Sequence, residues 1–179
     1  KRVVPSQSLL SQKTNEKKKL SEYEFFKSPI AELIPNVNVY SYDVNTPLFS
    51  DYASKKRFVF LPKDSQMEFS QIENTLLFET GSILIKNFYY PISKNEERII
   101  ETRLLIKEKE GWKPLNYIWN TEQTDASLNY IGADIEVEWM NSHEEIQKVN
   151  YSVPNQNQCK NCHISGSEIT PIGLTVSQL

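Results

Sequence analysis

The stretch DIEVEW (residues 134–139) decides the fold class, because acidic and apolar side chains alternate in it at strict period two. A strand with this pattern buries one face and exposes the other, as in an antiparallel sheet with one solvated side. Similar alternation runs through residues 100–107 and 148–153, and further strands are predicted at residues 58–61 and 82–90. The sequence is therefore predicted to be mainly β.

Turn residues between these stretches predict hairpins. Glu110 and Gly111 separate the strand that ends near Lys109 from another at residues 112–119, and residues 141–145 play the same part later. Six or more half-buried strands bury their apolar faces most simply in an antiparallel β-sandwich or a barrel-like domain.

The N-terminal region differs from the rest in composition. Residues 1–19 are polar and contain six Lys or Arg residues against Glu16 alone, so they are predicted to be a flexible basic tether. A short helix is predicted at residues 22–27, with Ser21 and Glu24 as a capping box and Leu20 and Phe25 as a hydrophobic staple.

Composition limits the class of protein. The 179 residues are 39% hydrophobic and 24% charged, the balance of an ordinary soluble globular protein, and they leave room for one domain or one domain and part of another. No apolar run reaches the length of a membrane span. The basic residues lack interleaved aromatic residues, so no nucleic-acid partner is predicted.

One motif carries recognisable chemistry. Cys159 and Cys162, followed directly by His163, form C-x-x-C-H, the signature of c-type haem attachment. On a helical turn this spacing sets both sulfurs along one haem edge, where they can add to the two vinyl groups, and His163 then reaches the iron as its proximal ligand. Pro171 or its neighbours could offer a carbonyl to the other imidazole nitrogen. The arrangement arises by chance about once in ten thousand shuffled sequences.

Three other interpretations of the cysteines stay open: a structural disulfide, a thioredoxin-like dithiol and half of a zinc site. A thioredoxin-type dithiol would follow a strand in a βαβ unit, whereas this pair follows a β-rich region. A closed zinc site needs four ligands, and His143 and carboxylates are the remaining candidates. Met67, Met140 and His143 are the candidates for a second axial ligand to haem iron.

Four collinear segments resemble a family of bacterial diheme c-type cytochromes. They are LSEY at residues 20–23, YDVNTPLFSDY at 42–52, ETRL at 101–104, and VPN at 153–155 leading through Gln158 into the cysteine motif. The resemblance spans residues 20–179. It implies covalently bound haem c, an extracytoplasmic location and a second motif in family members, so that this chain would match their N-terminal portion.

These observations predict three regions: a tether at residues 1–19, a β-rich domain at 20–153, and the truncated start of a helical cytochrome c module at 154–179. The predicted function is electron transfer to another redox protein, with an electron carrier favoured over an enzyme. A diheme peroxidase-like enzyme and a haem-free β-rich binding or assembly module are the alternatives. The predicted location is the periplasm or cell envelope, after removal of a signal peptide. If the tether anchors the protein to a membrane, the expected form is an outer-membrane lipoprotein.

Overall fold

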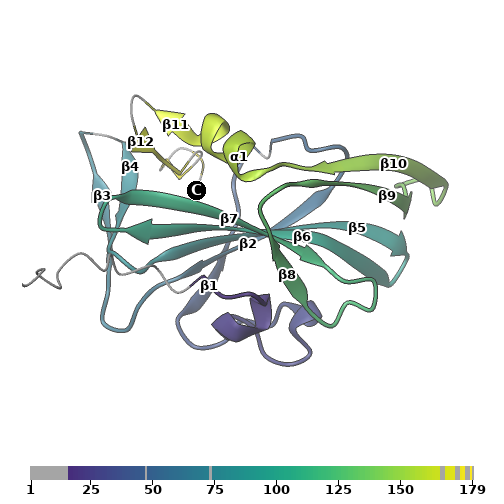
Figure 1. The fold of residues 1–179 in the computed structure, drawn as a ribbon, viewed down its shortest axis with the longest axis horizontal. Helices are drawn as coiled ribbons and strands as arrows, with labels where there is room; N and C mark the ends of the chain where they lie inside the picture. Colours follow the sequence, from purple (N-terminus) through teal and green to yellow (C-terminus); the bar gives the residue numbers. More distant parts are fainter. Residues whose placement is uncertain are drawn as a thin grey trace, which may run out of the picture.

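A computed structural model describes residues 16–46, 48–72, 74–165, 168–171, 174, 175 and 178. Its centre is a six-stranded antiparallel sheet (Figure 1). The strands in spatial order are β1 (Val39–Tyr42), β2 (Ser54–Phe60), β5 (Ile83–Ser93), β6 (Glu96–Glu108), β7 (Gly111–Trp119) and β8 (Ala126–Asn129).

Three two-stranded sheets and three short helices complete the described part of the chain. The smaller sheets are β3 (Met67–Ser70) with β4 (Thr75–Phe78), β9 (Ala133–Met140) with β10 (Ile146–Val153), and β11 (Ile164–Ser165) with β12 (Glu168–Ile169). The helices are the 3-10 turns η1 (Leu20–Tyr23) and η2 (Ile30–Glu32) and the α-helix α1 (Gln156–His163).

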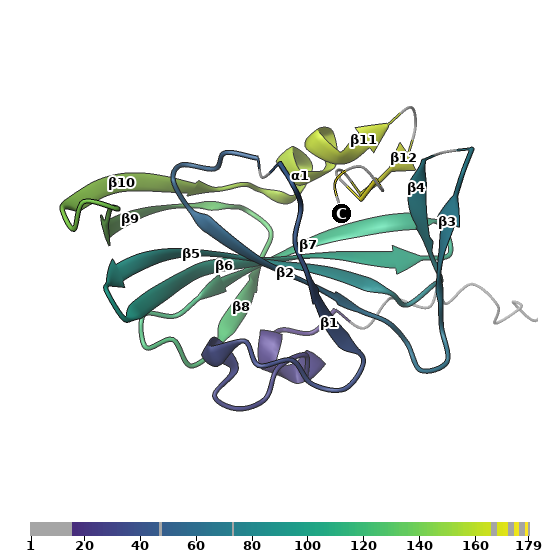
Figure 2. The same cartoon turned by 180° about the vertical axis from the view of Figure 1, so that it is seen from behind.

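The two faces of the main sheet are covered by different parts of the chain. On one face the N-terminal segment packs Leu20, Phe25 and Phe26 against apolar side chains of β2, β5, β6 and β7. On the other face the β9–β10 hairpin and α1 lie over the sheet, as Figures 1 and 2 show from opposite sides. The period-two pattern thus places apolar side chains in hydrophobic clusters on both faces of the sheet, so that neither face is fully exposed to water.

Most of the strand predictions are confirmed. β9, β6 and β10 contain the three alternating stretches. β2 and β5 each cover all but one residue of the two other predicted strands, and both predicted hairpins join neighbouring antiparallel strands. The predicted helical cytochrome module is not found in the described residues, where the eight-residue α1 is the only α-helix. The described part of the chain also lacks any helix with the length and hydropathy of a membrane span.

The prediction of a helix at residues 22–27 is wrong. The chain instead forms the 3-10 turn η1, which ends at Glu24 with φ 56°. Ser21 does not cap a helix, because its backbone N–H and its hydroxyl both donate to the carboxylate of Asp125, at 3.1 and 2.7 Å. Leu20 and Phe25 are both buried in the core, so they pack against the sheet and do not form the predicted hydrophobic staple of a helix.

The ordered fold also includes residues 16–19, the end of the predicted tether. The N–H of Leu128 donates to the carbonyl of Lys18 at 3.0 Å, and Lys19 forms a bridge to Ser127 of β8. Residues 1–15 lie outside the described part.

Gly132 lies between β8 and β9 and packs against the segment that leads from β10 to α1, which gives a first prediction. Its φ is +80°, and an added Cβ would lie 2.6 Å from the carbonyl oxygen of Val153. Gly132→Ala should therefore lower the free energy of unfolding by about 3 kcal/mol, from backbone strain and the clash together. Gly111→Ala is the control, because φ is +129° there but no atom lies within 4 Å of the added Cβ. Urea unfolding should show a clearly larger loss for Gly132→Ala, and equal losses would contradict the packing described.

Candidate functional site

Five polar residues form a single row across five neighbouring strands. The antiparallel register places Tyr42 of β1 opposite Arg57 of β2, Arg57 opposite Lys86 of β5, Lys86 opposite Arg103 of β6, and Arg103 opposite Asn116 of β7. Directly paired residues project from the same face of a sheet. The row therefore brings three cations, Arg57, Lys86 and Arg103, side by side; we call these three the cation row.

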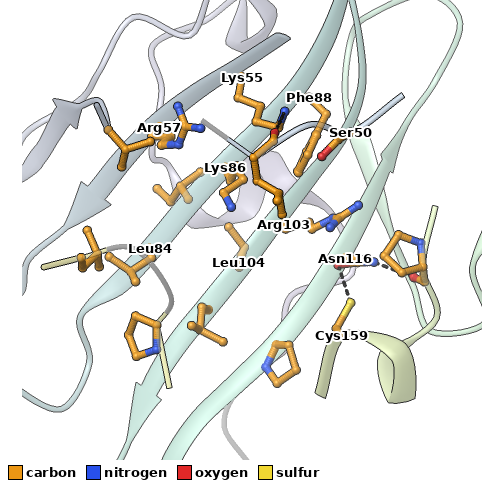
Figure 3. A pocket seen from close by; sticks show the side chains of 18 of the residues that line it. Ser50, Lys55, Arg57, Leu84, Lys86, Phe88, Arg103, Leu104, Asn116 and Cys159 are labelled. Carbon is orange, nitrogen blue, oxygen red and sulfur yellow. Dashed lines mark hydrogen bonds between the residues drawn. The ribbon is translucent and has the colours of Figure 1, made fainter. Parts of the chain in front are cut away.

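The row lies in a cavity of about 860 Å³ between the sheet and the C-terminal segment. Leu84, Leu105 and Leu174 supply apolar walls, and Lys55 of β2 adds a fourth cation. Small-molecule and cofactor sites commonly measure about 300–1,000 Å³ and combine apolar walls with a few polar groups. The cavity therefore has the size and lining of a cofactor site (Figure 3).

Helix α1 begins at a reciprocal capping box. The side-chain carbonyl of Asn155 accepts from the N–H of Gln158 at 2.9 Å, and the Gln158 side chain accepts from the N–H of Asn155 at 2.8 Å. This N-x-x-Q signal was present in the sequence and could have predicted where the helix starts.

Asn116 joins the row to α1. Its side-chain NH2 donates to the carbonyl of Pro154 at 2.7 Å, and its side-chain carbonyl accepts from the Cys159 thiol at 3.7 Å. Cys159 is 8% exposed and lines the cavity. Figure 3 shows Cys159 beside Asn116 at one end of the cavity, with Lys55 and Arg57 toward the opposite end.

Arg103 is held from two sides. Its guanidinium makes two hydrogen bonds to one carboxylate oxygen of Glu101, one of them 2.8 Å long, and its carbon lies 4.3 Å from the centre of the Phe88 ring. Tyr151 donates to the same carboxylate oxygen. Burial works against the charge of Arg103, but the Glu101 carboxylate outweighs it and raises the Arg103 pKa.

The other carboxylate oxygen of Glu101 is buried and has no hydrogen-bond donor among the described residues. Glu101 itself is 0% exposed. We predicted that Glu101 and Arg103 would lie on the wet face of their strand, and this is wrong. The β9–β10 hairpin covers that face, and the charges are tolerated there because Glu101, Arg103 and Tyr151 bind one another.

The remaining cations differ in how they are compensated. Arg57 is 6% exposed and pairs with Asp43 at 2.7 Å. The ammonium of Lys55 donates to the backbone carbonyls of Leu48 and Ala53, at 2.6 and 3.2 Å. Lys86 makes no ion pair with a described carboxylate, and burial together with the charges of Arg57, Arg103 and Lys55 lowers its pKa to about 8.

The low pKa of Lys86 gives a second prediction, for the protein without a bound ligand. Because the folded state binds this proton less tightly than the unfolded state, burial of charged Lys86 costs stability in full below pH 8. Stability should recover as the pH rises from about 8 toward the usual pKa of 10.5. Lys86→Met should therefore be the more stable protein below pH 8, and its advantage should shrink by about 3 kcal/mol over that window. Urea titrations of both proteins at pH 7 and pH 10 check the sign, and a constant difference would contradict it.

The predicted site residues can now be placed. Cys159 and Pro171 both line the cavity. Cys162 and His163 belong to α1, but only their backbone is in the described part of the structure. Met67 lies in β3 and Met140 ends β9, while His143 lies in the β9–β10 turn, and none of the three lines the cavity. A disulfide between Cys159 and Cys162 likewise falls outside what the structure describes.

The cation row was missed by the sequence analysis. Its members lie in three different strands, and only the strand pairing places their side chains next to one another. A charged residue in the middle of a strand as apolar as ILIKNFYY (residues 83–90) was the one local signal.

No protein-family model matches the chain, and no curated protein or solved structure is significantly similar to it. Across the described residues, no group of three or more His, Cys, Asp or Glu side chains could hold a metal ion. The assignment to bacterial diheme c-type cytochromes is therefore wrong. It depended on short collinear segments, and the described fold is mostly antiparallel β with one cysteine side chain placed and no helical module.

Proposed function

We propose that this protein carries one covalently attached haem c and transfers electrons to another redox protein. Cys159 and Cys162 are the attachment residues, and His163 is the proximal iron ligand. One observation carries the proposal: the C-x-x-C-H helix begins at the rim of a cofactor-sized cavity, and its first cysteine enters that cavity.

The helical backbone of α1 supports the roles of the three residues. Residues three and four positions apart share one face of an α-helix. Cys162 and His163 follow Cys159 by three and four positions, so the three positions share one face of the helix, and Cys159 lines the cavity. This is the arrangement that two thioether bonds and one axial ligand require.

The cavity also fits the group. Haem combines a flat apolar ring with two ionised carboxylates on one edge. Leu84, Leu105 and Leu174 suit the ring, whereas Lys55 and the cation row suit the carboxylates. When bound, haem supplies a one-electron couple at its iron.

The chain's own residues hold the ring, exclude water from it and orient His163. We assign the last role to a carbonyl at or near Pro171, which lines the same cavity and could accept from the second imidazole nitrogen. In this proposal the main sheet and the β9–β10 hairpin form the two layers of the predicted β-sandwich, and residues 154–179 form the segment that attaches haem. Thioether attachment takes place outside the cytoplasm, so we place the protein in the periplasm or cell envelope, where residues 1–15 could tether it.

The test is to produce the chain with and without a bacterial haem-attachment system. Under denaturing conditions, the loaded protein should keep a mass increase of one haem, and its alkaline pyridine spectrum should be that of a haem with two thioether bonds. Reversible reduction by dithionite and reoxidation by ferricyanide should follow. Cys159→Ala/Cys162→Ala is the control, which should fold on the core between the sheet and the N-terminal segment and carry no covalent haem.

Absence of covalent haem from folded wild-type protein would sink the proposal and favour a haem-free binding module, for which the same cavity would be the site. Peroxide turnover by the loaded protein would favour a peroxidase over an electron carrier.

A further inference from the structure

We propose that Lys55 and the cation row form a binding site for a pair of carboxylates, those of the haem propionate groups, and thereby fix the orientation of haem in the cavity. The proposal rests on the proposed function, which names the cofactor but assigns no protein group to its carboxylates.

The row itself is the first observation. Arg57, Lys86 and Arg103 are direct neighbours on three hydrogen-bonded strands, which lie about 4.8 Å apart in a sheet. Like charges placed directly opposite each other destabilise a sheet, and burial increases the cost. An anion bound beside the row would offset this cost.

The charges inside the cavity give the second observation. Asp43 compensates Arg57, and Glu101 compensates Arg103. Lys55 and Lys86 make no ion pair with a described carboxylate, and none of the described residues that line the cavity is Asp or Glu. The cavity therefore carries an excess of two positive charges, the number that two carboxylates neutralise.

The positions of the groups give the third observation. Cys159 lies at one end of the cavity, and Lys55 and Arg57 lie toward the other, with Lys86 and Arg103 between them (Figure 3). In haem the vinyl groups and the propionates are on opposite sides of the ring. Thioether bonds at the Cys159 end therefore direct the propionates toward the cations.

Arg103 is already fixed for this task. Glu101 takes one side of its guanidinium, Phe88 supports its face, and Tyr151 anchors Glu101. A donor fixed before the ligand arrives loses little conformational entropy on binding. Lys86, between two arginines, gains most from an anion.

The experiment is to measure urea unfolding of haem-loaded and haem-free protein for wild type and Lys86→Met. In haem-free protein the substitution should raise the unfolding midpoint, because it removes an uncompensated charge. In haem-loaded protein it should lower the midpoint, because it removes a partner of a propionate. Lys86→Arg should keep the loaded midpoint near that of wild type, and Lys148→Met, at an exposed position of β10, should shift neither form.

A higher midpoint for Lys86→Met in both forms would overturn the proposal. If wild-type protein takes up no thioether haem, the proposed function fails, and glutarate then serves as a free pair of carboxylates. Stabilisation of wild type by glutarate, lost in Lys86→Met, would uphold the carboxylate site without haem. No stabilisation of wild type would overturn this proposal as well.

Discussion

Glu101→Gln is expected to lower the free energy of unfolding by about 3 kcal/mol, because it breaks a buried ion pair from one side. The substitution removes the charge that compensates Arg103 and leaves that guanidinium beside Lys86. It also weakens the acceptor that Tyr151 uses. Urea unfolding at pH 7 measures the loss.

Glu136→Gln is the matched control, since Glu136 is an exposed residue of β9. Its effect should stay within about 0.5 kcal/mol, the usual range for a surface substitution. Equal effects of the two substitutions would mean that Glu101 is solvated, contrary to the packing of the β9–β10 hairpin on the sheet.

His163→Ala is expected to abolish the native low-spin spectrum of loaded protein while covalent haem remains. The two cysteines hold the ring through thioether bonds that do not involve the iron. Only His163 follows the second cysteine directly and can reach the proximal face of the iron. His143→Ala should leave the spectrum unchanged, because His143 is placed by the β9–β10 turn, away from the cavity. An unchanged spectrum in His163→Ala, from protein with confirmed thioether haem, would refute the ligand assignment.

The strands were predictable because their signal is local. Alternation in β9 is visible in the six consecutive residues 134–139, and the turns after β6 and β9 are marked by residues that suit hairpins. The same alternation was misleading in β6. A polar position can face solvent or a partner charge, and only the tertiary cover of Glu101 by β10 decides between them.

The site was predictable in part, for the same reason. The cysteine motif is contiguous in the sequence, whereas the cation row depends on the pairing and register of three separate strands. The short helix at residues 22–27 failed because Asp125, about a hundred residues away, binds Ser21. The family assignment failed because similarity in a few short segments is not enough to establish a common fold.

The most direct test of the account is where haem lies, since the central claim places it over the cation row. Methyl NMR spectra of reduced, loaded protein should show strong ring-current shifts for Leu84 and Leu105, which line the cavity, relative to haem-free protein. Leu33 and Leu115, in the core on the opposite face of the sheet, should keep their shifts. Covalent haem without any shift at Leu84 and Leu105 would contradict the account.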